Sequence, residues 1–297
     1  FGFRIEVLQD STVRYANQPI ALVIAETLEA ATEGAALLNP QYDADEPRTG
    51  IDDGLRFDPP AVGVGGPPKA AFGDVEAGLA KAAQVLERDY VTPAQYHNAM
   101  EPHAVVAEWD GDHVMLDMPN QALAMSCASY ATYFGIPPEN VTIRSPFLGG
   151  GFGSKAIING PQILAILAAR ALKRPVKLVL SRAQMYGPVG HRGGTWQKLR
   201  IGLNNDGQLT ALHHKSISAT SSFDDFLEPA ANASTHLYAS PALLSEHEGI
   251  RLDTGTPGPM RAPGEASGSA ALEVAIDEAA DACGMDPLDS RLHNYAE

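Results

Sequence analysis

The chain has 297 residues, 44% hydrophobic and 19% charged, which excludes disorder over its whole length and predicts about two globular domains. Its 21 Lys and Arg residues against 36 Asp and Glu give a net charge of −15, which disfavours nucleic acid as a partner because phosphates would be repelled. No stretch reaches the roughly 20 apolar residues of a membrane-spanning helix, and the separated Cys127 and Cys283 support neither a disulfide framework nor a cysteine zinc site.

The first predicted unit is a strand followed by a helix. Residues 20–25 form a compact apolar run, and an Ala-rich helical stretch follows over residues 27–38. Residues 43–72 contain many prolines and glycines, which leave little regular structure possible. This composition predicts a linker at residues 49–73, between a first unit at residues 1–48 and a second at 74–297.

The second unit mixes helices and strands. Residues 74–80 are predicted to form a short helix capped by Asp74, and residues 85–91 a strand. A hairpin is expected over residues 104–117, because Gly111 tolerates the positive φ of a tight turn, and a meander is expected to continue from it. The later elements are a helix at 122–134 with Asn120 as its cap, a strand at 141–145, a helix at 161–172, a buried strand at 176–180, a hairpin within 199–219 and an amphipathic helix at 268–283 followed by Gly284. The fold class predicted from this order is α+β.

The sharpest local signal is a run of four glycines around one aromatic residue, at residues 149–155. Glycines let the backbone pass very close to a ligand, while the loop holds out the ring of Phe152. A Walker A loop needs glycine directly before Lys155, where Ser154 stands, and the dinucleotide fingerprint fails at the same residue. The alternative is a flexible surface loop, which an apolar ring between glycines disfavours.

Residues 95–103 carry an amide, two imidazoles and a carboxylate. A metal triad of His97, Glu101 and His103 is one interpretation. It is disfavoured because the histidines lie six residues apart and Pro102 breaks any helix between them. Hydrogen-bonded structural groups are the favoured alternative.

Residues 259–266 place a single arginine among Pro and Gly residues that fix its backbone. Such an Arg261 suits a carbonyl or carboxylate as its partner. The alternatives are an exposed side chain and one paired with Glu265.

Together and in this order, these segments resemble the molybdenum-cofactor subunit of the xanthine dehydrogenase and aldehyde oxidase family. Residues 14–19 and the strand and helix after them resemble a partial α/β hammerhead domain. The three motif segments resemble the first molybdopterin-cofactor-binding domain, cut short at its C-terminal end. Residues 118–121 and 260–265 are most similar to the bacterial periplasmic aldehyde oxidoreductase branch, whose cofactor is molybdopterin cytosine dinucleotide.

The resemblance implies roles for individual residues. Gln95 would hydrogen-bond a metal-bound oxygen, and Arg261 would position the substrate or stabilise charge on the aldehyde oxygen. The pterin, and no protein side chain, would hold the molybdenum directly. The residues implied on the apical side of the metal are Gly150, Gly151, Phe152 and Gly153.

The implied substrate pocket departs from that of the xanthine-oxidising members. Ala156 stands where they have a Glu, and Pro229 aligns with their Arg, while Pro263 lies in the same implied pocket. A purine would leave polar groups unpaired in such a pocket, so the resemblance implies apolar or aromatic aldehydes as substrates.

The implied reaction is oxidation of an aldehyde to a carboxylic acid, with water as the oxygen source and electrons leaving through 2Fe-2S clusters and FAD on partner subunits. The sequence starts at Phe1 without a signal-peptide pattern and ends in a helix-like segment, which indicates a fragment; the location stays open between cytoplasm and periplasm. The family's general-base Glu lies beyond this chain, so the chain alone is predicted to be inactive. The alternatives are N-heterocycles, purines or carbon monoxide as substrates within the same family, or a truncated scaffold module without activity.

Overall fold

A computed structural model describes residues 4–296 of the chain. The helices are α1 (Leu28–Ala36), α2 (Val75–Lys81), α3 (Leu123–Phe134), α4 (Gly160–Leu172), α5 (Glu265–Ala282) and α6 (Pro287–His293). The strands are β1 (Leu55–Phe57), β2 (Lys69–Phe72), β3 (Gln84–Thr92), β4 (Ala104–Asp110), β5 (His113–Asp117), β6 (Val141–Arg144), β7 (Val176–Val179), β8 (Thr195–Leu203), β9 (Leu209–Ser221) and β10 (Leu243–Leu252). The mixed class predicted from the sequence is confirmed.

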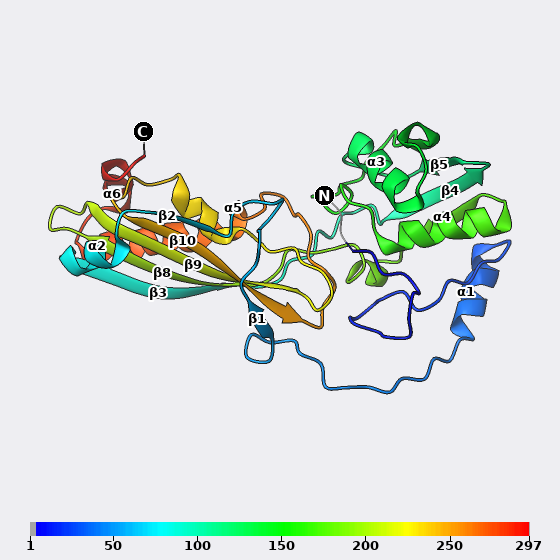
Figure 1. Cartoon of the computed structure of the whole chain (residues 1–297), viewed down its shortest axis with the longest axis horizontal. Helices are drawn as coiled ribbons and strands as arrows, with labels where there is room; N and C mark the ends of the chain where they lie inside the picture. Colours follow the sequence, from blue (N-terminus) through cyan, green and yellow to red (C-terminus); the bar gives the residue numbers. More distant parts are fainter. Residues whose placement is uncertain (1–3, 297) are drawn as a thin grey trace.

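The elements form two lobes that lie side by side along the long axis of the molecule (Figure 1). One lobe holds a six-stranded sheet in the order β1-β10-β9-β8-β3, with β2 paired beside β1 along β10. The other holds a four-stranded sheet in the order β6-β5-β4-β7. Among residues 4–296, no helix combines the length and the apolarity that crossing a bilayer requires.

The four-stranded sheet contains the predicted hairpin but no meander. Strands β4 and β5 pair antiparallel, and Gly111 between them has a φ of +60°. The expected meander is wrong, because β6 runs parallel to β5. A parallel neighbour needs a crossover, and α3 supplies it. The strand expected to be buried at residues 176–180 is an edge strand, in which Val179 is 52% exposed.

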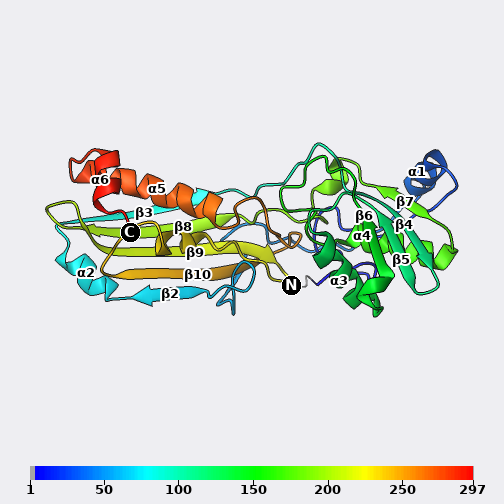
Figure 2. The ribbon, with the colours of Figure 1, turned by 90° about the horizontal axis from the view of Figure 1, so that it is seen from above.

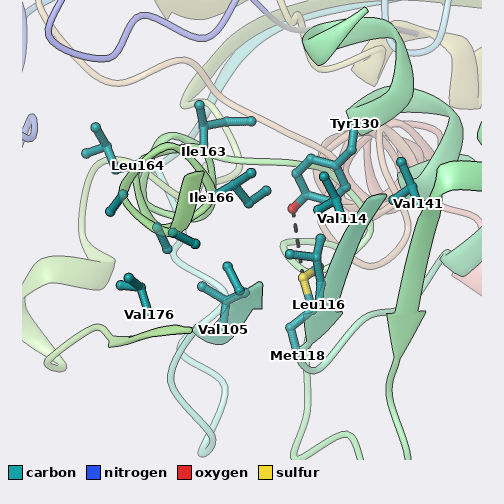
Figure 3. Close-up of a cluster of buried hydrophobic side chains, with 14 of the residues drawn as sticks. Val105, Val114, Leu116, Met118, Tyr130, Val141, Ile163, Leu164, Ile166 and Val176 are labelled. Atoms are coloured by element: carbon teal, nitrogen blue, oxygen red, sulfur yellow. Dashed lines mark hydrogen bonds between the residues drawn. The ribbon is translucent and has the colours of Figure 1, made fainter. Parts of the chain in front are cut away.

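Helix α4 covers this sheet with an apolar face (Figure 3). Its start is fixed by a capping box, in which Asn159 and Gln162 each accept a hydrogen bond from the other's backbone N–H. Ile163 and Ile166 are fully buried and belong to one cluster with Tyr130 of α3. Helices α3 and α4 therefore share one apolar core with this sheet.

The six-stranded sheet has α5 along one face (Figure 2). The predicted hairpin between β8 and β9 is confirmed, while β9 and β10 run parallel. The predicted face of α5 is buried in one cluster with sheet residues such as Leu199 and Leu212. Gly284, with a φ of +68°, follows the helix end at Cys283 as the sequence indicated.

Two further expectations are wrong in the N-terminal part. Residues 20–25 form no strand and none of them is buried, because no neighbouring strand pairs with them within residues 4–296. Residues 43–72, expected to lack regular structure, contain β1 and β2, because both pair antiparallel with the distant β10. The helix at residues 27–38 is confirmed as α1, capped by Thr27, and the one at 74–80 as α2, capped by Asp74. The boundaries at 1–48, 49–73 and 74–297 stay a prediction.

Candidate functional site

The segments that the sequence singled out come together between the two lobes. The glycine run follows β6 of the four-stranded sheet, and residues 259–264 lead from β10 into α5 of the other lobe. The backbone N–H of Arg261 donates to the carbonyl of Phe152 across this junction, at 2.8 Å. The N–H of Glu101 donates to the carbonyl of Gly149 at 3.0 Å. Backbone hydrogen bonds thus join all three segments.

The glycine loop, residues 149–155, is tightly packed on the rest of the chain. Gly153 has a φ of +114°, and a Cβ there would lie 2.0 Å from the carbonyl oxygen of Pro259. A Cβ on Gly151 would lie 2.2 Å from Oε1 of Gln121. Phe152 itself has a φ of +55°, a conformation that costs a non-glycine residue about 1–2 kcal/mol, and its side chain remains 42% exposed. The loop is fixed in place rather than flexible, and it presents a ring outward.

A partly buried ion pair anchors the glycine loop to residues 95–103. The Lys155 side chain is fully buried, and its Nζ donates to the carboxylate of Glu101 at 2.8 Å and to the Glu101 carbonyl at 2.9 Å. The N–H of Gly149 donates to the same carboxylate at 2.8 Å. Burial lowers the pKa of Lys155, while the Glu101 carboxylate opposes that shift. Burial alone would raise the pKa of Glu101, but the Lys155 ammonium and the Gly149 N–H outweigh it, so this pKa is lowered.

The two histidines of residues 95–103 contact carbonyl groups. His97 Nε2 lies 3.0 Å from the carbonyl oxygen of Pro259, and His103 Nε2 lies 3.4 Å from that of Ser154. Burial lowers the pKa of both imidazoles, that of His103 to about 4, so each is neutral at pH 7 and donates its N–H. Within residues 4–296, no three or more His, Cys, Asp or Glu side chains gather as a metal site requires. The geometry favours the structural interpretation of this motif.

Arg261 presents an exposed side chain beside a strained backbone. Its guanidinium makes no ion pair or hydrogen bond within the described residues 4–296, so the pairing with Glu265 is not found. The next residue, Ala262, has a φ of +57°, which again costs about 1–2 kcal/mol. The guanidinium is therefore available to a ligand, and its backbone position is over-determined by surrounding contacts.

The analysis of the sequence missed Arg192 and Glu228. Their side chains are 4% and 0% exposed and form an ion pair of 2.7 Å. The Arg192 guanidinium also donates to the carbonyls of Arg261, at 2.6 Å, and Ala262, at 3.2 Å. Glu228 accepts from the N–H of Gly264 at 2.7 Å, and burial raises the pKa of its carboxyl against the influence of these donors. The signals that could have found them are an arginine among glycines at residues 190–194 and a lone acid in the apolar run 226–231.

Gln95 lies beside Arg192 through its main chain. The N–H of Gln95 donates to the Arg192 carbonyl at 3.1 Å, and the Arg192 N–H donates back at 2.8 Å. The Gln95 side chain is exposed and makes no hydrogen bond within residues 4–296.

The predicted pocket residues lie at two places on the site. Pro229 is half-buried against the Arg261 segment, since a Cβ on Gly264 would lie 2.7 Å from its Cγ. Pro263 is exposed in that same segment. Ala156 is half-buried at the far end of the glycine loop, where its N–H donates to the carbonyl of Gly153 at 3.0 Å.

A protein family described as molybdopterin cofactor-binding domain matches residues 60–295. The chain belongs to this family. It is 39% identical over 295 residues to the aldehyde oxidoreductase molybdenum-binding subunit PaoC of Escherichia coli K12, a match that covers 97% of this chain and 39% of that protein. It is 26% identical over 305 residues to the nicotine 6-hydroxylase large subunit of Paenarthrobacter nicotinovorans, covering 97% of this chain and 37% of that subunit. The predicted resemblance to xanthine dehydrogenase and aldehyde oxidase molybdenum subunits is confirmed, and the chain spans about two fifths of the length of these curated relatives.

The fold is also similar to that of a solved family structure. Quinoline 2-oxidoreductase from Pseudomonas putida 86 matches with a TM-score of 0.78 at 24% sequence identity, covering 92% of this chain and 36% of that one.

The residues of this chain fit a polar, anionic cofactor such as molybdopterin. The glycine loop is clamped with its ring outward, and the exposed amide of Gln95 and guanidinium of Arg261 have no partner within residues 4–296. The amide offers both donors and an acceptor, and the guanidinium offers a charged fork. Phe152 adds an exposed apolar surface at the same junction, so the family assignment and the local chemistry agree.

Proposed function

We propose that the chain is part of a molybdenum hydroxylase subunit that oxidises aldehydes to carboxylic acids. The observation that carries the proposal is the junction of the glycine loop with the Arg261 segment, in a chain 39% identical to an aldehyde oxidoreductase molybdenum-binding subunit. In this proposal water supplies the oxygen atom, and electrons pass to 2Fe-2S clusters and FAD on an iron–sulfur subunit and a flavin subunit. Residues 1–48 belong to a partial α/β hammerhead domain.

The cofactor in this proposal is molybdopterin in its cytosine dinucleotide form. When bound, it supplies the two-electron oxidation of the substrate carbon. Residues of the glycine loop would hold it, and the Gln95 carboxamide would donate a hydrogen bond to one of its polar atoms. The loop residues assigned here are Gly150, Gly151, Phe152 and Gly153.

Arg261 binds the substrate carbonyl in this proposal. Negative charge develops on an aldehyde oxygen as the carbonyl carbon is attacked, and a guanidinium whose backbone is already fixed stabilises that charge without reorganising. The pair of hydrogen bonds from Arg192 and the one to Phe152 hold this backbone. Arg261 therefore acts as an electrostatic catalyst and orients the substrate.

The substrate pocket is assigned to Ala156, Pro229 and Pro263. None of the three offers a side-chain hydrogen bond, so the pocket favours aldehydes with apolar or aromatic groups. The likeness to nicotine 6-hydroxylase and quinoline 2-oxidoreductase makes an N-heterocycle the second candidate substrate.

The test uses the full-length subunit purified with its partner subunits from a host that makes the cofactor. We expect near-stoichiometric molybdenum, CMP on acid hydrolysis, and faster turnover of benzaldehyde than of isoquinoline or xanthine. Arg261→Ala should lower kcat/KM for benzaldehyde by about 10²–10³-fold while leaving the molybdenum content unchanged.

Other results of this test separate the alternatives. Preferred turnover of isoquinoline would move the substrate to the N-heterocycles. Molybdenum-free protein would favour a scaffold module without activity.

A further inference from the structure

We propose that Arg192, together with Glu228, is a positioning residue that fixes Arg261 relative to Gln95. The inference rests on the proposed function for the roles of Arg261 and Gln95, and on the described contacts for everything else. It explains how Gln95 and Arg261, which are far apart in the sequence, are held at a fixed distance from each other.

The first step is that one residue contacts both segments. The main chain of Arg192 exchanges two hydrogen bonds with Gln95, at 3.1 and 2.8 Å. Its guanidinium donates to the carbonyls of Arg261 and Ala262, at 2.6 and 3.2 Å. The backbones of the two proposed functional residues are therefore linked through a single residue, Arg192.

The second step is that this side chain cannot move away. Arg192 is buried and ion-paired to Glu228, whose carboxylate also accepts from the N–H of Gly264 at 2.7 Å and from Ser267 Oγ at 3.3 Å. The ion pair thus brackets the Arg261 segment, because Arg192 donates to its carbonyls. Glu228 accepts from the N–H of Gly264, the N-cap of α5.

The third step is that the segment needs such a clamp. Ala262 and, on the facing loop, Phe152 both have φ near +56°, a region that L-residues adopt only when neighbouring contacts impose it. Arg192 donates to two successive carbonyls, those of Arg261 and Ala262, which flank the Cα of the strained Ala262. Without those bonds the segment would relax, and the backbone that carries Arg261 would no longer be held at a fixed distance from that of Gln95.

The first test is amide hydrogen exchange on the full-length subunit prepared without cofactor. Arg192→Lys keeps the charge beside Glu228 but removes the planar fork that reaches two carbonyls. We expect peptides from residues 259–265 and 149–155 to exchange about tenfold faster or more. Unchanged exchange in both segments would overturn the proposal.

The matched control is Arg291→Lys, at a site far along the same lobe. Arg291 also bridges a carboxylate and a backbone carbonyl, both from Glu273, at 2.7 and 3.1 Å. It should loosen α5 and α6 locally without altering exchange at residues 149–155. Equal loosening of that loop by both variants would mean a general loss of stability and would also overturn the proposal.

The second test is a double-mutant cycle on the loaded enzyme. Arg192→Lys should lower kcat for benzaldehyde by about 10- to 100-fold with a smaller change in KM, because a shift of about 1 Å in a positioned group has effects of this size. In an Arg261→Ala background the same substitution should cost less than about threefold, because the group it positions is gone. Equal factors in the two backgrounds contradict a positioning role.

A second variant covers the case in which Arg192→Lys does not fold. Glu228→Gln keeps an acceptor for Gly264 and Arg192 but weakens both bonds, so exchange should rise within residues 259–265 alone, by a smaller factor. No rise there would contradict the clamp. A wild-type enzyme without aldehyde turnover would overturn the proposed function and leave the exchange experiment to decide the role of Arg192.

Discussion

The cores beneath α4 and beneath α5 differ in the side chains that they bury. Under α4, the cluster around Ile163 and Ile166 is apolar, and the hydroxyl of Tyr130 at its edge donates to Gln162. Under α5, an apolar cluster gives way near the start of β8 to a polar network. There His214 lies 2.7 Å from Ser234 Oγ and 2.9 Å from Gln197 Oε1, while Gln197 donates to the carbonyl of Ser267 at 3.1 Å.

The polar network under α5 reaches the candidate site. Ser267 connects the polar network to the candidate site, since its hydroxyl lies 3.3 Å from the Glu228 carboxylate. Apolar packing tolerates small shifts of a backbone, whereas a hydrogen bond fixes one atom against another. The comparison teaches that the fold uses apolar packing to build each lobe and directional bonds to fix the segments that meet between them.

The largest effect is expected at that junction, from Gly153→Ala. The new Cβ would lie 2.0 Å from the Pro259 carbonyl at a φ of +114°, so the free energy of unfolding should fall by about 4 kcal/mol or more. The control is Gly111→Ala, where φ is +60° and no atom lies within 4 Å, with an expected loss of about 1 kcal/mol. Chemical unfolding of both variants measures the difference, and equal losses would show that the junction is not tightly packed.

The next largest loss of stability is expected in the apolar cluster under α4. Ile166→Ala opens a cavity in the cluster under α4, so the free energy of unfolding should fall by about 3 kcal/mol. Leu167 is its neighbour on the same helix and is 39% exposed, so Leu167→Ala should cost under about 1 kcal/mol. Similar losses from the two variants in chemical unfolding would contradict the placement of α4.

A smaller effect is expected on the pH dependence of the free energy of unfolding, which should differ between changes in the two cores. Burial lowers the pKa of His214 to about 3, from an ordinary value of 6.5, so the unfolded chain takes up a proton before the folded chain does. The stability that the neutral imidazole gives is complete above pH 6.5 and is lost as the pH falls toward 3. His214→Gln should reduce the slope of unfolding free energy against pH, between pH 6 and 4.5, by about 1.4 kcal/mol per pH unit.

The control for this slope is Tyr130→Phe in the other core. The Tyr130 hydroxyl donates to Gln162 Oε1 at 2.6 Å, and burial raises the pKa of the phenol, so it does not titrate in this range. The variant should lower stability by about 1 kcal/mol at every pH. If the unfolding free energy of wild type and His214→Gln has the same slope against pH, the polar network is not the cause of acid sensitivity.

The smallest effect is expected on the solvent side of the six-stranded sheet. Lys198 pairs with Glu87 at 2.7 Å, but both side chains are about half exposed. Lys198→Ala should change the free energy of unfolding by about 0.5 kcal/mol or less, and 1 M salt should abolish the difference. A larger, salt-resistant loss would mean that this face contributes more to stability than its exposure suggests.

The sequence by itself determined the local elements and the chemistry of the loops. The cap at Asp74, the turn at Gly111 and the apolar face of α5 depend on neighbours in the chain, so short-range patterns were enough. The cap expected at Asn120 is wrong, because the N-cap of α3 is Ala122, which makes no side-chain cap hydrogen bond. The glycine run and Arg261 were recognised because a bare loop and a lone arginine among Pro and Gly are unusual in composition. The resemblance to the family depended on the order of these motifs along the chain.

Only the tertiary structure decided how these pieces meet. Strands β1 and β2 exist because β10, far away in the sequence, offers them hydrogen bonds, and no local pattern carries that information. Residues 20–25 have strand-like composition but lack a pairing partner within residues 4–296. Arg192 and Glu228 are charged residues that sequence reasoning places at the surface, and their mutual hydrogen bonds make burial possible.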